Sequence, residues 1–295
     1  MKIGFIGLGA MGMPMAKNLL KDPENTVFAY DLVERTREIA REQGMTVFQT
    51  AREVAENAEI LFLSLPNANI VEVTLKSIFT PGNNSLTVST IADVSTIAPK
   101  SSVHFGKWCE EEGIKYMDCP VSGGVGGAEK GTLTFMVGGE KASFEKILPV
   151  LKQIGKNIYH MGDVGSGSAV KIVNNYILAC NMISTVEGLI LGTKMGLDVR
   201  TMYDIINKSS GRSFITDNKL PNFIIPRKFD GGFAINLQQK DLRLALDSGA
   251  YETVPLFMGT LASQVFESAI AKGLGAQDIT SVLKIYEELI DMNVE

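Results

Sequence analysis

The stretch Lys2-Ile-Gly-Phe-Ile-Gly-Leu-Gly-Ala-Met-Gly12 decides the fold of the first part of the chain. Its beginning, Lys2–Ile6, is short, apolar and compatible with a β-strand, and it leads directly into a glycine-rich turn. From Ala10 to Leu20 the apolar residues recur at the spacing of a helix. The stretch therefore predicts a strand, a tight turn and a helix in immediate succession.

The glycine spacing in this turn is that of a dinucleotide-binding fingerprint. Gly7 permits the tight turn, Gly9 lets the backbone approach a pyrophosphate, and Gly12 lets the helix pack closely on the strand. A second expected strand, Thr26–Tyr30, leads into Asp31, whose carboxylate can accept hydrogen bonds from the adenosine ribose. An ordinary glycine-rich strand–helix turn is the alternative. The predicted cofactor site comprises Gly7, Gly9, Ala10, Met11, Gly12 and Asp31.

Asp31 favours NAD over NADP, because a carboxylate there repels a 2′-phosphate. Leu32 and Val33 supply no cation, although Arg35 lies in the same neighbourhood, so that NADP stays possible. Asp31 can also act as the N-cap of an expected helix at Glu34–Gln43, and that role does not exclude contact with the ribose.

The chain beyond this start divides into two regions of different character. Alternating strands and helices up to residue 163 predict an α/β Rossmann-type domain with a mostly parallel sheet. Residues 164–295 carry long helical patterns and predict an all-α domain, joined to the first by a long interdomain helix. The further strands are expected at Ile60–Leu65, Leu86–Ser89 and Lys115–Met117, and the helices at 99–112, 167–195, 199–209, 236–251, 255–272 and 279–289.

Two loops follow expected strands, at Leu65-Pro-Asn67 and Asp93-Val-Ser-Thr96. In an open parallel sheet, ligands lie beyond the carboxyl ends of the strands. Leu65, Pro66 and Thr96 are therefore expected beside the nicotinamide half of the cofactor. Taken alone, Pro66 and Thr96 would be ordinary turn residues.

Composition excludes several classes of function. The chain has 295 residues, 45% of them hydrophobic and 21% charged, with a net charge of −5, so nucleic acid and anionic membranes are not expected partners. Cys109, Cys119 and Cys180 form no CxxC pair, and His104 and His160 are the two histidines, so neither a disulfide framework nor a zinc or other metal site is expected. Because the N-terminal apolar run lacks an Ala-x-Ala-type cleavage site and no uninterrupted apolar run reaches roughly 20 residues, we expect a cytoplasmic protein without a transmembrane span.

The segment Asp118-Cys-Pro-Val-Ser-Gly-Gly-Val-Gly-Gly127 is unusually rich in small residues. Five of the six residues from 122 to 127 are serine or glycine, which leaves backbone N–H groups uncovered and suited to an anion such as a carboxylate. Ser122 adds a hydroxyl donor. A flexible loop without a ligand is the alternative reading.

A long apolar helix is expected from Gly165 to Met195, and it carries a lysine in its second turn. Lys171, Asn174 and Asn175 can share one helical face. Transfer of a hydride between nicotinamide and an alcohol carbon requires a proton to move at the oxygen, and a desolvated lysine can move it. Lys171 is thus a candidate acid/base with Asn175 in support. The alternative is a lysine that snorkels to solvent.

Four blocks of the sequence resemble the signatures of the β-hydroxyacid dehydrogenase family. They are Phe5–Leu19, Asp118–Gly124, Gly165–Asn175 and Lys240–Ala245, and they occur in the family's order across nearly the whole chain. The resemblance implies a Rossmann-type domain followed by an all-α domain, commonly assembled as homodimers or homotetramers.

The resemblance also implies roles for individual residues. Lys171 would be the catalytic acid/base, supported by Asn175, and a small carboxylate-bearing substrate would be held by Ser122, Gly123 and Gly124. The cofactor would be contacted by Leu65, Pro66 and Thr96, and by Lys240 from the helical domain. Without the resemblance, Lys240 reads as a solvated charge beside Asp241.

Within the family, Ser209–Ser213 and Asp230–Phe233 look most like 3-hydroxyisobutyrate dehydrogenases. Close members usually carry tryptophan where this chain has Phe214, which leaves the substrate side-chain pocket open. The expected reaction is NAD-dependent oxidation of a small 3-hydroxy acid, with 3-hydroxyisobutyrate first. The alternatives are an NADPH-dependent reductase of succinic, tartronate or sulfolactaldehyde-like semialdehydes, and a dinucleotide-binding module without turnover.

Overall fold

The computed structural model describes residues 1–79 and 86–294. Contacts divide the chain into two compact units, Met1–Lys171 and Ile172–Glu295. The predicted boundary after residue 163 lies just before helix α8 (Ser166–Lys194), and the division itself falls within that helix.

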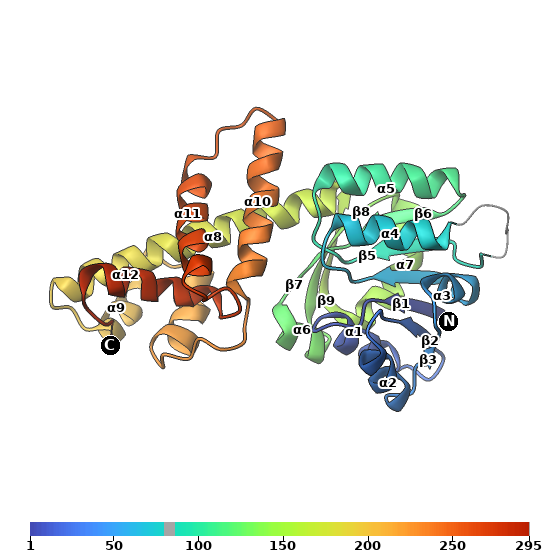
Figure 1. Ribbon diagram of the computed structural model, residues 1–295, viewed down its shortest axis with the longest axis horizontal. Coiled ribbons are helices and arrows are strands. Elements are labelled where there is room, and N and C mark those ends of the chain that lie inside the picture. Colours follow the sequence, from blue (N-terminus) through green and yellow to red (C-terminus); the bar gives the residue numbers. More distant parts are fainter. Residues whose placement is uncertain (80–85, 295) are drawn as a thin grey trace. The chain divides into compact units, whose positions relative to one another are not determined.

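The first unit is an α/β domain built on a mostly parallel sheet, as predicted (Figure 1). Among the described residues the strand order is β3-β2-β1-β4-β5-β6-β8-β7, with β9 paired to β8. Neighbouring strands from β3 to β6 are parallel, and β8 runs antiparallel to β6 and β7. The chain order reverses between β1 and β4, which is the topological switch point where such sheets bind ligands. The strands are β1 (Lys2–Ile6), β2 (Thr26–Tyr30), β3 (Thr46–Val47), β4 (Ile60–Leu63), β5 (Thr90–Asp93), β6 (Lys115–Asp118), β7 (Val121–Ser122), β8 (Leu133–Gly138) and β9 (Gly155–Gly162).

Helices cover both faces of this sheet, so its central strands are apolar on both sides. In β4, Ile60 and Phe62 belong to one core cluster, which also holds residues of α1 and α7. Leu61 and Leu63 belong to the opposite cluster, with residues of α3, α4 and α5. The helices are α1 (Gly12–Leu19), α2 (Glu34–Glu42), α3 (Ala51–Asn57), α4 (Ala68–Ile78), α5 (Pro99–Glu111), α6 (Gly124–Lys130) and α7 (Lys141–Ile154).

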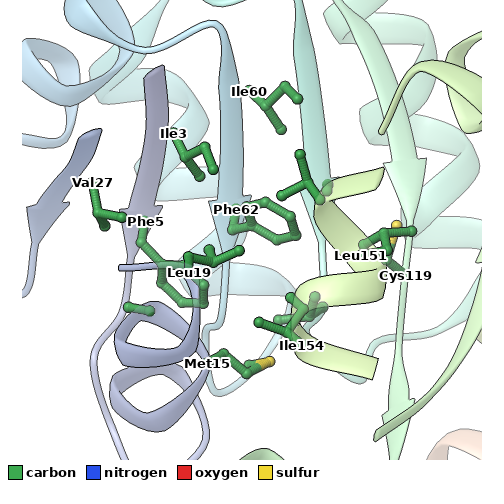
Figure 2. Close-up of a cluster of buried hydrophobic side chains, with 14 of the residues drawn as sticks. Ile3, Phe5, Met15, Leu19, Val27, Ile60, Phe62, Cys119, Leu151 and Ile154 are labelled. Atoms are coloured by element: carbon green, nitrogen blue, oxygen red, sulfur yellow. The ribbon is translucent and has the colours of Figure 1, made fainter. Parts of the chain in front are cut away.

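One of these clusters fixes the first helix against the sheet (Figure 2). The rings of Phe5 and Phe62 stack with centroids 5.6 Å apart, and Met15 and Leu19 of α1 lie beside them. All four side chains are fully buried. The start of α1, which follows the glycine turn, is therefore held at the carboxyl end of β1.

The strand expected at Leu86–Ser89 is wrong, because pairing begins at Thr90. The N–H groups of Thr87 and Val88 donate to the carbonyl of Ala55, in helix α3, at 3.3 and 3.1 Å. The apolar residues before β5 therefore pack as an irregular segment.

The second unit is helical, as predicted. Besides the greater part of α8, it contains α9 (Val199–Ile206), a π-helix η1 (Ile215–Ile224), α10 (Ile235–Tyr251), α11 (Phe257–Ala271), a 3₁₀ turn η2 (Ile279–Val282) and α12 (Leu283–Ile290). The π-helix was not anticipated, and it carries Lys219, which forms a buried ion pair with Asp278 just before η2.

Helix α8 is long and apolar enough to cross a membrane by length and composition alone, which differs from the expectation above. Core helices of soluble proteins have the same property. In this structure α8 carries the buried polar side chains of Ser168, Lys171 and Asn175, and it contributes six residues to the core of the second unit. Packing inside the fold therefore covers part of its apolar surface, while Val173, Ile177 and Leu191 are exposed.

Candidate active site

The candidate cofactor residues of the first unit lie where parallel strands end. Gly7 follows β1, Asp31 follows β2, and Leu65 and Thr96 come two or three residues after β4 and β5. Because carboxyl ends of parallel strands meet at one edge of a sheet, these segments share that edge. The switch point between β1 and β4 places Gly7 and Leu65 on adjacent strands.

The three glycines of the turn meet different surroundings. Gly7 has φ +89°, and a Cβ there would lie 2.3 Å from the carbonyl oxygen of Ser64. A Cβ on Gly12 would lie 1.9 Å from the carbonyl oxygen of Gly7, so helix and turn are in close contact. A Cβ on Gly9 would meet nothing within 4 Å, and Gly9 and Ala10 are exposed. The middle of the turn is therefore open, and it fits the approach of a pyrophosphate at a helix N-terminus.

The carboxylate of Asp31 is held beside this turn by backbone groups. Its Oδ2 accepts the N–H of Leu8 at 2.7 Å, and its Oδ1 accepts the N–H of Val33 at 2.9 Å. The N-cap of α2 is Val33, and no side chain caps that helix, so the suggestion that Asp31 is the N-cap is wrong. Asp31 instead links the glycine turn to the end of β2.

The cations near Asp31 are engaged with carboxylates. Arg35, the cation considered for a 2′-phosphate, pairs with Glu38 at 3.0 Å. Arg37 pairs with Glu34 and also donates to the carbonyl of Asp31 at 2.6 Å. Hydrogen bonds from Arg41 and Arg37 hold the pKa of Glu34 below its ordinary value. Arg37 was missed by the sequence reasoning, although its place six residues after Asp31 could have suggested it.

A hydrogen-bonded chain connects the two loops expected beside the nicotinamide. The Oγ of Ser95 accepts the N–H of Leu65 at 2.9 Å, and the N–H of Ser95 donates to Oδ1 of Asp93 at 2.9 Å. The hydroxyl of Tyr116 donates to Oδ2 of Asp93 at 2.7 Å. Burial raises the pKa of Asp93 to about 6. Sequence reasoning selected Thr96 and passed over Asp93 and Ser95, although an Asp-x-Ser after a strand is a recognisable turn signal.

The glycine-rich segment after β6 is a strand end and a helix start, and only part of it is a loop. Ser122 lies in β7 opposite Thr134 of β8, and α6 begins at Gly124. Gly123 and Gly124 have φ +129° and +62°, and both are exposed. Two left-handed glycines at the start of a helix leave N–H groups uncovered, which suits a carboxylate.

Lys171 lies in the second turn of α8 and is 8% exposed, which argues against a side chain that snorkels to solvent. Asn175, one turn later, is also buried, whereas Asn174 is exposed. The expectation that Lys171, Asn174 and Asn175 share one face is therefore wrong for Asn174. Its Nδ2 instead donates to Oδ1 of Asn175 at 2.9 Å.

The amide of Asn175 is held by α10. Its Nδ2 donates to Oδ2 of Asp241 at 2.6 Å, and its main-chain carbonyl accepts the side-chain amide of Gln238 at 3.0 Å. Lys240 pairs with the other oxygen of Asp241 at 3.1 Å. Gln238 and Asp241 were missed as candidates, because their link to α8 spans more than 60 residues of sequence.

No group of three or more histidine, cysteine, aspartate or glutamate side chains within residues 1–79 and 86–294 could hold a metal ion. The groups described here are a glycine turn open to solvent at Gly9, two exposed glycines with positive φ that suit an anion, and the buried Lys171.

Family models match both parts of the chain. Residues 2–162 match the NAD binding domain of 6-phosphogluconate dehydrogenase, and residues 165–286 match the NAD-binding domain of NADP-dependent 3-hydroxyisobutyrate dehydrogenase. These two models together cover most of the sequence.

Individual proteins are similar over nearly the full length. A 2-(hydroxymethyl)glutarate dehydrogenase of Eubacterium barkeri is 50% identical over 99% of this chain and 97% of its own. The mitochondrial 3-hydroxyisobutyrate dehydrogenase of Mus musculus is 39% identical over 97% of this chain and 87% of its own. The solved structure of Mycobacterium tuberculosis 3-hydroxyisobutyrate dehydrogenase with L-serine superimposes with a TM-score of 0.90 at 29% identity, covering 97% of this chain and 98% of that chain.

Two family models and relatives well above 30% identity therefore lead to one conclusion: the chain is an NAD- or NADP-binding oxidoreductase that belongs to the β-hydroxyacid dehydrogenase family.

Proposed function

We propose that this protein is an NAD-dependent dehydrogenase of a 2-substituted 3-hydroxypropanoate, with 2-(hydroxymethyl)glutarate as its first substrate. The observation that carries the proposal is the 50% identity to a 2-(hydroxymethyl)glutarate dehydrogenase across 99% of the chain. 3-Hydroxyisobutyrate is the second candidate, because the mouse relative at 39% identity is named for it. Both acids carry a primary alcohol on the carbon next to the carboxylate-bearing carbon, and they differ in the substituent at C2.

In the proposed reaction, Lys171 accepts the proton of the substrate hydroxyl while the hydride leaves the alcohol carbon. Its burial supports this role, because a side chain shielded from bulk water can pass a proton directly to and from a bound hydroxyl group. The side chain of Asn175 is held in place by its 2.6 Å hydrogen bond from Nδ2 to Oδ2 of Asp241. We propose that it helps to orient Lys171 and the substrate hydroxyl. Nicotinamide supplies the hydride acceptor when it is bound. The products are an aldehyde and the reduced cofactor.

The other roles follow the ends of the strands. Ser122, Gly123 and Gly124 bind the substrate carboxylate, supported by the uncovered backbone at the two left-handed glycines. Asp31 binds the adenosine ribose and favours NAD, supported by the engagement of Arg35 with Glu38. The nicotinamide half is proposed to contact Leu65, Pro66, Thr96 and Lys240.

The substrate is tested by steady-state kinetics on a panel of hydroxy acids with both cofactors. We expect the highest kcat/KM with 2-(hydroxymethyl)glutarate and NAD, a lower value with 3-hydroxyisobutyrate, and little turnover of L-serine. A higher kcat/KM with 3-hydroxyisobutyrate would contradict this assignment and make 3-hydroxyisobutyrate the substrate. NAD binding without turnover of any acid or semialdehyde would make the protein a binding module.

The role of Lys171 is tested by Lys171→Ala, with Val173→Ala at an exposed position of the same helix as matched control. Loss of the acid/base group should lower kcat by about 10²–10⁴ while NAD affinity stays within about twofold. The control should retain most of kcat. An equal loss of NAD affinity in Lys171→Ala would give the lysine a structural role instead.

A further inference from the structure

The buried carboxylate of Asp118 lies beside the start of helix α8, and it has no role in the proposed function. Asp118 is the last residue of β6 and is 1% exposed. Its Oδ1 accepts the N–H of Gly165 at 2.7 Å, and its Oδ2 accepts the N–H of Ser168 at 2.6 Å. Both carboxylate oxygens are therefore directed at the start of α8, across about 50 residues of sequence.

The two N–H groups are those that the first turn of a helix leaves without partners. Helix α8 begins at Ser166, so Gly165 occupies the N-cap position and Ser168 is the third helical residue. In many helices the side chain of the N-cap residue satisfies such a group. Here the N-cap is Gly165, with φ +98°, which has no side chain to accept a hydrogen bond. The carboxylate of Asp118 in β6 accepts the two N–H groups instead.

The backbone of α8 is also pressed against the sheet at this point. A Cβ on Gly167 would lie 2.2 Å from the carbonyl oxygen of Met136 and 2.7 Å from that of Asp118. The Oγ atoms of Ser102, in α5, and Ser168 are 2.9 Å apart. The first turn of α8 is thus fixed from β6, β8 and α5. Lys171 follows Ser168 by three residues, so its Cα position is set by this turn.

We propose that Asp118 is a positioning residue that sets the location of Lys171 by clamping the first turn of α8 onto the end of β6. The inference rests on the proposed function, in which Lys171 moves the substrate proton. Asp118 contacts neither the reacting atoms nor the cofactor in this role. Its effect on the reaction passes entirely through α8.

Replacing Asp118 with asparagine tests whether its two hydrogen bonds, and not merely its volume, position the turn. Its shape is that of aspartate, but it offers one acceptor oxygen and directs an NH₂ group at the remaining N–H. One buried N–H is then left without an acceptor, and the turn has to shift to relieve the clash. A shift of the catalytic group by about 1 Å can cost up to about a hundredfold in rate.

The test is a double-mutant cycle of Asp118→Asn and Lys171→Ala on the full-length enzyme, with NAD and the best substrate of the panel. We expect Asp118→Asn alone to lower kcat by about 10- to 100-fold, with KM for substrate and Kd for NAD within about twofold. In the Lys171→Ala background the same change should alter kcat by less than about twofold, because the group that it positions is gone. Multiplying effects in the double variant would overturn the proposal.

Asp93 provides the matched control, because it is the register partner of Asp118 on β5 and is equally buried. Its carboxylate accepts hydrogen bonds from Ser95 and Tyr116, and neither of these residues lies on α8. Asp93→Asn should therefore act on cofactor affinity, and its effect on kcat should multiply with that of Lys171→Ala. If Asp93→Asn also lost its effect on kcat in the Lys171→Ala background, the coupling would be a general effect of a buried carboxylate. That result would overturn the specific role of Asp118.

Ser102→Ala is the milder variant if Asp118→Asn does not fold, as judged by circular dichroism and thermal unfolding. It removes the hydrogen-bond partner of Ser168 in the same turn and should lower kcat about threefold in the parent and not in Lys171→Ala. A threefold loss that persists in both backgrounds would contradict the proposal. If Lys171→Ala itself leaves kcat unchanged, the proposed function fails first, and the two failures are thus distinguishable.

Discussion

At the scale of single residues, we predict that Asp31 sets the preference of the glycine turn for NAD over NADP. Its carboxylate is held by the N–H groups of Leu8 and Val33, so it cannot easily turn away from a 2′-phosphate. We expect Asp31→Ser to lower the ratio of kcat/KM for NAD to that for NADP by about 10- to 100-fold, since a charged hydrogen bond is lost and a repulsion removed. Glu38→Ser is the control, because it frees Arg35 without altering Asp31. A larger effect in the control would assign the preference to the arginine.

Asp93 makes the stability of the first unit depend on pH. Burial raises its pKa from 3.8 to about 6, and the hydrogen bonds from Ser95 and Tyr116 offset part of this effect. The folded state therefore binds the proton more tightly than the unfolded chain, and raising the pH through this window lowers the free energy of unfolding. For a fully buried group, the difference corresponds to about 2 kcal/mol between pH 4 and pH 7.

Asp93→Asn should remove that dependence. We expect its melting temperature, measured by scanning fluorimetry, to rise relative to the parent as the pH increases from 4 to 7. In Tyr116→Phe, which lacks a donor to the carboxylate, the loss of stability should extend to higher pH. A constant difference between Asp93→Asn and the parent across this range would show that the carboxyl ionises normally in the fold.

At the scale of elements, the π-helix η1 is held to η2 by a buried ion pair. Lys219 contacts Asp278, which also accepts the N–H groups of Phe233 and Thr280. The ammonium lies 4.1 Å from the ring centroid of Phe223. A pair whose side chains are 7% and 0% exposed is costly to break, because the remaining charge is left buried.

Lys219→Met should lower the free energy of unfolding of the second unit by about 3–5 kcal/mol. The matched control is Arg212→Met, which breaks an ion pair with Asp217 whose side chains are 60% and 51% exposed, and which should cost less than about 1 kcal/mol. Urea denaturation followed by circular dichroism measures both. Equal losses would mean that the burial of Lys219 contributes nothing to the packing of η1.

At the scale of the whole molecule, the end of α10 and the start of α11 expose large apolar side chains. Tyr251, Phe257, Met258 and Leu261 are each more than half exposed. Several exposed apolar side chains so close together in the sequence are typical of an interaction site. We therefore predict a homodimer or homotetramer that covers these residues.

Light scattering coupled to size exclusion tests this assembly. Phe257→Glu combined with Leu261→Glu should shift the mass toward the 32.0 kDa monomer, because two charges would be buried without partners. Leu289→Glu, on the exposed apolar residue of α12, is the control and should leave the mass unchanged. A monomeric parent protein would contradict the prediction, and dissociation by the control alone would move the interface to α12.

The sequence by itself determined the features that depend on local spacing. The strand, glycine turn and helix at Lys2–Leu20 follow from the local pattern of apolar residues and glycines. The spacing of Lys171 and Asn175, one helical turn apart, is likewise visible in the sequence. The alternation of strands and helices, followed by long helical patterns, was sufficient for the fold class. Local pattern could not distinguish the irregular segment at Leu86–Ser89 from a strand, because the partner of Val88 is the distant carbonyl of Ala55.

Tertiary structure alone decided which polar groups meet. The clamp of Asp118 on Gly165 and Ser168, and the contact of Asn175 with Asp241, join residues separated by 47 to 66 positions. Such pairs leave no periodic signal, since their approach is set by strand register and helix packing. The same packing turned Asn174 to solvent and Asn175 inward, although the two are neighbours in the chain. The sequence singled out Lys171 as a candidate, and only the folded chain showed the carboxylate that anchors its helix.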